Sequence, residues 1–282
     1  MWRLLGAVAL AGTVAAAVGS AQLWLAGWAG VYHPRLAFHP VDQWYGNPEW
    51  PRQLIVLAWC VSSAVLVGAA VAGPLAGRTR WRYVVAAAAA LGPAAAMRLA
   101  TGPATRASAG FDVGSDAFRA VVIGAVLGGL MALAIVRWRG AGRSAVVWVG
   151  WIWCTAAVAV LSYERRPDHI VPVPALTDPG WWPVAAAVVV AALLGWWAGR
   201  RADPHPVWFA VVGPVMLLAV SVGVHPLLPG GDHRAVAVTQ FSAVVWSLTA
   251  LAGAASAAAG VHIACGPGRT KRQGVGVRGR QG

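Results

Sequence analysis

Two long uncharged runs flank a basic turn in the middle of the chain. The first run covers residues 120–136, the second covers 144–163, and the turn at 137–143 holds three arginines and no acid. Runs of this length are about what a helix needs to cross a hydrocarbon layer of roughly 30 Å. Arginine-rich connections stay on the cytoplasmic side of a membrane. The pattern therefore predicts a transmembrane helical hairpin whose turn lies in the cytoplasm.

The composition extends this interpretation to the whole chain. Of the 282 residues, 59% are hydrophobic and only 11% are charged, whereas a soluble domain carries about 25% charged residues. The net charge is +13, but the basic residues stand singly between apolar runs. They form no basic face interleaved with aromatic residues, so nucleic acid is not an expected partner. The expected partners are the lipid bilayer and, within it, other membrane proteins or further copies of this chain.

The same pattern of apolar runs predicts an all-α polytopic integral membrane protein with one transmembrane domain over 1–265. Eight spans are expected, at 4–31, 53–77, 83–101, 120–136, 144–163, 181–199, 207–224 and 235–265. The first run also fits a cleavable signal peptide, but its length beyond the candidate cleavage site favours a retained helix. The basic tail at 266–282 is expected to be disordered.

Charge sets the expected orientation. With both termini in the cytoplasm, the inner segments carry 14 basic residues and one acid, and the outer segments carry 8 of each. This is the distribution that the positive-inside rule requires. Arginine outnumbers lysine 21 to 1, which is typical of GC-rich bacterial genes. The expected location is therefore the cytoplasmic membrane of a bacterium.

Four short sequence marks recur in the same order in both halves of the chain. They are Trp-Pro at 50–51 and 182–183, Ala-Gly-Arg at 76–78 and 198–200, Gly-Pro at 92–93 and 213–214, and an acid before Arg-Ala-Val at 119–121 and 234–236. Four helices per unit would give two halves in the same orientation, a parallel repeat. The alternative is chance similarity in a chain biased towards alanine, valine and glycine.

Polar residues within the spans are mainly hydroxyls and one amide, and many of them lie in span eight. They fit either hydrogen bonds between helices or the lining of a narrow polar path. Gly124 and Gly128 in span four, and Ser256 and Gly260 in span eight, have the spacing of small residues at close helix contacts. Almost no ionisable group lies within the spans, which disfavours ion coupling through acids in the core.

Polar residues of the outer connections form a candidate catalytic site. The candidate acid and base groups are Asp112, Asp116, Asp168, His169, Asp232 and His233. Such side chains can serve as acid and base for a lipid-linked substrate, but their spacing matches no metal motif. The alternative is that Asp116 and Asp232 cap helix N-termini. Candidate substrate-binding residues are Arg98, Arg119, Arg234 and Gln240, with interfacial snorkelling as the alternative for the arginines.

No cofactor or metal is predicted. The three cysteines lack metal or redox spacing, and the chain holds no phosphate-binding loop, zinc-protease or nucleophile-elbow motif. The leading hypothesis is a permease-like membrane subunit that handles a small or lipid-linked solute. A non-catalytic scaffold subunit of a membrane complex and a membrane enzyme with an outer Asp/His site are the alternatives.

Overall fold

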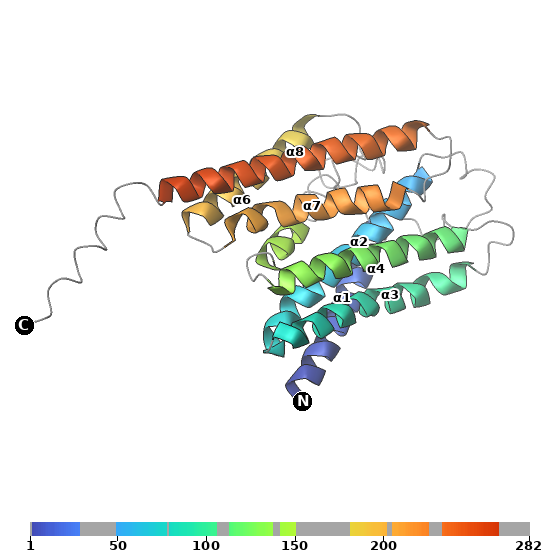
Figure 1. The fold of residues 1–282 in the computed structure, drawn as a ribbon. Coiled ribbons are helices and arrows are strands. Elements are labelled where there is room, and N and C mark those ends of the chain that lie inside the picture. Colours follow the sequence, from blue (N-terminus) through green and yellow to red (C-terminus); the bar gives the residue numbers. More distant parts are fainter. Residues whose placement is uncertain are drawn as a thin grey trace, which may run out of the picture.

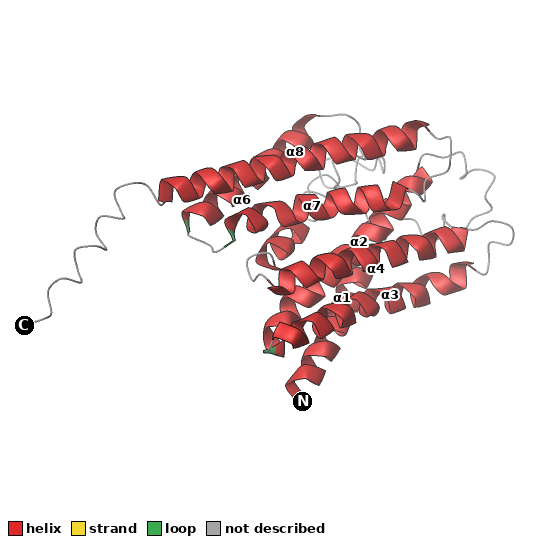
Figure 2. Ribbon diagram, viewed as in Figure 1, coloured by secondary structure: helices red, strands yellow, loops and turns green. Residues whose placement is uncertain are grey.

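A computed structural model describes residues 2–28, 49–77, 79–105, 113–137, 142–150, 181–201, 205–225 and 233–264. The regular elements of this part of the chain are all helices (Figure 2). They are α1 (Trp2–Trp28), α2 (Glu49–Ala72), the short 3-10 helix η2 (Gly73–Ala76), α3 (Thr79–Thr105), α4 (Val113–Arg137), α6 (Trp181–Arg200), α7 (Pro206–Val224) and α8 (His233–Ala264). Residues 142–150 form a further helical segment. The predicted all-α class is confirmed for the described residues.

Within the described residues, five helices contain a segment that is long and apolar enough to cross a membrane. These segments are Trp2–Ala26, Leu54–Ala76, Ala117–Arg137, Pro206–Gly223 and Ala243–Ala264. Helix α6 adds a shorter apolar stretch, Ala185–Arg200. The predicted span 83–101 lies within α3, and only the start of the predicted span 144–163 is described. The tail at 266–282 lies outside the described residues.

Helix α2 is the centre of the bundle. Every residue from Leu54 to Leu66 is buried, and a helix that is covered on all sides carries apolar residues all round. It packs against α1, α3, α4 and α7. Because neighbouring helices surround α2, large side chains such as Leu57 and Trp59 are buried against them.

The helices form two packed groups. In the first group α2 and α3 pack on each other, and both α1 and α4 pack on this pair. In the second group α6, α7 and α8 all pack with one another, and α7 joins the groups through contacts with α2 and α4. Figure 1 shows α7 and α8 side by side, α3 and α4 side by side, and α2 crossing behind. The most extensive packing is between α2 and α4 in the first group and between α6 and α8 in the second.

Most of the outer helices bury small residues and expose large ones. The buried face of α1 includes Ala7, Ala11 and Ala15. The exposed stripe of α4 consists of Val122, Val126, Leu130 and Leu133, and that of α8 includes Val244, Leu248 and Leu251. Large exposed aliphatic stripes are unusual in a water-soluble monomer, whereas small residues at helix contacts are typical of membrane bundles.

Glycines allow several of these helices to meet at backbone distance. A Cβ placed on Gly128 of α4 would lie 2.8 Å from the Cα of Ser62 in α2, and one on Gly68 of α2 would lie 2.8 Å from the Cβ of Ala15. In the second group, a Cβ on Gly260 of α8 would lie 2.8 Å from the carbonyl oxygen of Trp196 in α6. The close packing expected at Gly124, Gly128 and Gly260 is confirmed, because each lies against a neighbouring helix.

Candidate functional site

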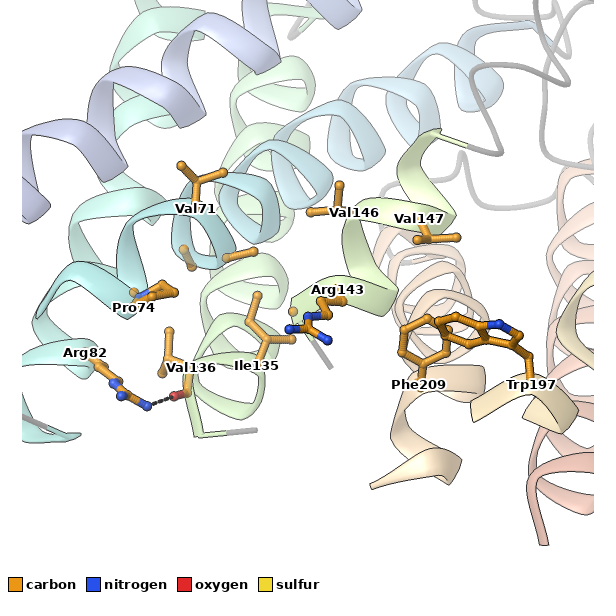
Figure 3. A pocket seen from close by; sticks show the side chains of 14 residues that line it. Val71, Pro74, Arg82, Ile135, Val136, Arg143, Val146, Val147, Trp197 and Phe209 are labelled. Atoms are coloured by element: carbon orange, nitrogen blue, oxygen red, sulfur yellow. Dashed lines mark hydrogen bonds between the residues drawn. The ribbon is translucent and has the colours of Figure 1, made fainter. Parts of the chain in front are cut away.

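A groove opens where the two groups of helices meet, at the end of the bundle near the basic turns. Its volume is about 720 Å³. One wall is formed by α2, η2, the start of α3 and the end of α4, and the other by segment 142–150, the end of α6 and the start of α7 (Figure 3). The groove therefore brings together residues from both halves of the chain.

Two arginines line this mostly apolar groove. Arg82 comes from the first turn of α3 and Arg143 from segment 142–150. In Figure 3, Arg82 lies beside Pro74 and Val136, and Arg143 lies between Ile135 and Phe209. Among the described residues that line the groove there is no aspartate or glutamate. The site is therefore positively charged, which favours an anionic ligand.

Arg82 is held by the end of α4. Its Nη1 donates a hydrogen bond of 3.4 Å to the carbonyl oxygen of Val136, which is in the last turn of the helix. Carbonyl groups there have no partner within the helix, and the negative end of the helix dipole attracts a cation. The Nε of Arg82 is buried and has no hydrogen-bond partner among the described residues. Within the described part of the chain the terminal N–H groups of Arg82 make only the bond to Val136, so the remaining ones can serve an acceptor in the groove.

The second wall is fixed by contacts between segment 142–150 and α7. The Ser144 hydroxyl donates to the carbonyl oxygen of Phe209, and the ring of Trp148 lies where a side chain on Gly213 would have to be. Phe209 in turn lies 5.4 Å, between ring centroids, from Trp197 of α6. Arg143 is therefore carried by a segment that is packed tightly on its neighbour.

The residues predicted for an outer site lie away from this groove or outside the described ones. Asp112, Asp168, His169 and Asp232 lie outside the described residues, and Arg98, Asp116, His233, Arg234 and Gln240 lie in helices whose side chains are not described at those positions. Arg119 is exposed on α4. It is 17 positions before Val136 in the same helix, a distance of about 25 Å. The outer Asp/His site stays a prediction, and so do the roles proposed for these arginines and Gln240.

Several described hydroxyl groups within the helices bond either to a neighbouring helix or to a carbonyl oxygen of their own helix. Ser63 donates to the side-chain oxygen of Gln22 at 2.8 Å and also contacts the carbonyl oxygen of Trp59 in its own helix. Thr249 donates to the carbonyl oxygen of Val245, four residues before it. The bond between Ser63 and Gln22 supports the interpretation of the spans' hydroxyl groups as hydrogen bonds between helices, whereas the Thr249 hydroxyl is satisfied within its own helix. Within the described ranges, no three His, Cys, Asp or Glu residues gather as metal ligands.

Arg82 and Arg143 are not among the residues that the sequence predicts for a site. Both belong to basic turns, which in the sequence indicate only orientation. The one signal for a shared site was that both turns are predicted to lie on the cytoplasmic side of the membrane. Which turns meet, however, depends on how the hairpins pack.

Comparisons with protein families, with curated proteins and with solved structures give no match for this chain. The class of the protein therefore rests on its own structure. The described residues form a helical bundle with five helices suited to crossing a membrane, and this is compatible with a helical membrane protein.

Proposed function

We propose that this protein is a permease-like subunit of a bacterial cytoplasmic membrane that handles a small or lipid-linked anionic solute. The observation that carries the proposal is the groove between the two helix groups, which has Arg82 on one wall and Arg143 on the other. Binding sites at the interface of two helical halves are common in transporters, because a change in the angle between the halves exposes the site on either side.

The packing of the two groups supports a parallel repeat of two four-helix units. Helices α2 and α4 make the most extensive contact in the first group, and α6 and α8, which would be their counterparts, do so in the second. The glycine of each Gly-Pro pair also has a matching position. Gly92 of α3 lies against Gly12 of α1, and Gly213 of α7 lies against Trp148 of segment 142–150, which would be the counterpart of α1.

Eight spans with both termini in the cytoplasm fit this arrangement. The groove is lined by residues next to three basic turns, near positions 78–82, 137–143 and 200–201. Such turns remain on the cytoplasmic side of a membrane. The groove then opens towards the cytoplasm and the adjoining lipid leaflet.

The contact between the halves offers a route for motion. Among helices α1 to α4 and α6 to α8 it runs through α7 against α2 and α4, and it is less extensive there than the packing inside either group. Groups that are packed more tightly within than between can move as units. A tilt of the second group relative to α2 would widen or narrow the groove.

Transport by purified protein in lipid vesicles tests this proposal. Uptake of a panel of small anions and the transbilayer movement of fluorescent phospholipids should both be measured for the wild type and for the double variant Arg82→Gln/Arg143→Gln. We expect at least one solute to cross faster with the wild type than in empty vesicles, and the double variant to lose that increase. Arg80→Gln/Arg200→Gln is the matched control, since neither of these arginines lines the groove.

Equal rates with and without the protein across the panel would contradict a transport role. If the inactive protein instead co-purified with a stoichiometric membrane partner, the scaffold hypothesis would replace the permease hypothesis. These two outcomes separate the candidate functions without requiring the identity of the solute.

A further inference from the structure

We infer that the groove binds one anionic phospholipid, with the phosphate-bearing headgroup at Arg82 and Arg143 and the acyl chains along its aliphatic sides. The inference rests on the membrane placement proposed above, and it names an occupant for the same groove. Three features carry it: the unbalanced positive charge, the incompletely bonded guanidinium group of Arg82, and the exposed valines beside the arginines.

The positive charge of the groove favours an anionic ligand. Arg82 donates one hydrogen bond of 3.4 Å through Nη1, which is long for a bond from a charged donor. Its Nε is buried, so a ligand would meet the guanidinium group at the terminal N–H groups. Within the described part of the chain these groups make only the bond to Val136. A phosphate oxygen would accept from the remaining ones, and guanidinium groups match phosphate geometry well.

The valines beside the arginines favour an amphiphile over a water-soluble anion. Val71, Val146 and Val147 line the groove, and each residue is between 41% and 46% exposed. Acyl chains would cover these side chains, whereas inorganic phosphate would leave them uncovered. A headgroup and its chains together match both the polar and the apolar part of the site.

The surrounding residues place the groove at headgroup depth. Arg201 stacks over Trp197, with its guanidinium carbon 4.4 Å from the ring centroid, and Trp197 lines the groove. Tryptophan and arginine are both enriched at the boundary between headgroups and hydrocarbon. Basic pockets between transmembrane helices at this depth hold anionic headgroups.

Native mass spectrometry of the full-length chain tests the inference. The protein is delipidated in detergent and then given phosphatidylglycerol, phosphatidylcholine or inorganic phosphate. We expect one bound phosphatidylglycerol, with affinity on the order of tenfold higher than for phosphatidylcholine, because the net negative headgroup is attracted by two cations. Arg82→Gln/Arg143→Gln should lose this preference, and Arg80→Gln/Arg200→Gln should keep it.

A single variant guards against misfolding. Arg143 is exposed, so Arg143→Gln should leave the fold intact and still weaken phosphatidylglycerol binding. Equal lipid binding by the wild type and both groove variants would overturn the inference. So would displacement of the lipid by inorganic phosphate, since this would indicate a site for a soluble anion.

The outcomes also separate this inference from the proposed function. One-to-one binding of phosphatidylglycerol without any transport would leave the lipid site in place and reject the permease hypothesis. Transport by a protein that shows no preference for anionic lipid would support the permease hypothesis and reject the lipid site.

Discussion

The hydroxyl group of Ser63 in α2 donates a hydrogen bond of 2.8 Å to the side-chain oxygen of Gln22 in α1. Both residues are buried. The bond joins the first helix to the central one at a level where neither sequence run contains a charge. It is the clearest described case of a polar contact between two of the apolar helices.

A double-mutant cycle between Gln22→Leu and Ser63→Ala should reveal a coupling of about 0.6 kcal/mol, the average for hydrogen bonds between helices in a membrane. Unfolding free energies in mild detergent provide the measurement. Ser62→Ala is the control, because the Ser62 hydroxyl donates to the carbonyl oxygen of Trp59 within its own helix. Additive effects of Gln22→Leu and Ser63→Ala would show that the bond contributes nothing measurable.

Neighbouring glycines of α4 should respond in opposite ways to alanine. A Cβ on Gly128 would lie 2.8 Å from the backbone of Ser62, whereas one on Gly129 would lie 3.5 Å from the Cβ of Ala90, an ordinary contact. Gly128→Ala should destabilise the protein by about 1–3 kcal/mol through overpacking. Gly129→Ala should be neutral or stabilising by up to about 1 kcal/mol, since alanine favours the helix. Thermal unfolding of the two variants side by side checks this, and an equal loss in both would contradict it.

The contact between Gly213 and Trp148 predicts a rescue. Gly213→Ala should lower the unfolding temperature, because its methyl group would overlap the ring of Trp148. In a Trp148→Ala background, the same substitution should cost little. Gly150→Ala serves as the control, since a Cβ there meets no atom of the described residues within 4 Å. Persistence of the full penalty without the indole ring would show that the segment packs elsewhere.

Labelling of α4 from outside the cell should depend on position. In a cysteine-free background, a cysteine replacing Phe118 should react with a membrane-impermeant maleimide in intact cells. A cysteine replacing Arg137 should react only after permeabilisation, because arginine-rich ends stay inside. Both positions are exposed in the structure, so burial does not account for a difference. The reverse pattern would invert the proposed orientation.

The helices themselves were predictable because a span leaves a direct record in the sequence. The run 120–136 lies within α4, and 181–199 differs from α6 only at its last residue. The observed helix boundaries differ from the predicted ones where charged or polar residues extend a helix beyond its apolar part. Helix α2 thus begins at Glu49, four positions before the predicted start.

The groove was not predictable, because neighbouring arginines of one turn differ in role. Arg80 is exposed and stacks on Trp81 at 4.9 Å, whereas Arg82 faces the end of α4. Two positions along a helix rotate a side chain by about 200°, and only the packing of α3 on α4 decides which arginine turns inward. The pairing of Gln22 with Ser63 was hidden for the same reason, since 41 positions separate them.

The small interior faces of the outer helices have a consequence for how this chain can vary. Each alanine or glycine there is already near the lower limit of side-chain size, so nearly every substitution adds atoms where none fit. The exposed valines and leucines can exchange with other aliphatic residues at little cost. Among related chains, the inward alanines and glycines should therefore change slowly, whereas the residues of the exposed stripes should exchange freely with other hydrophobic residues.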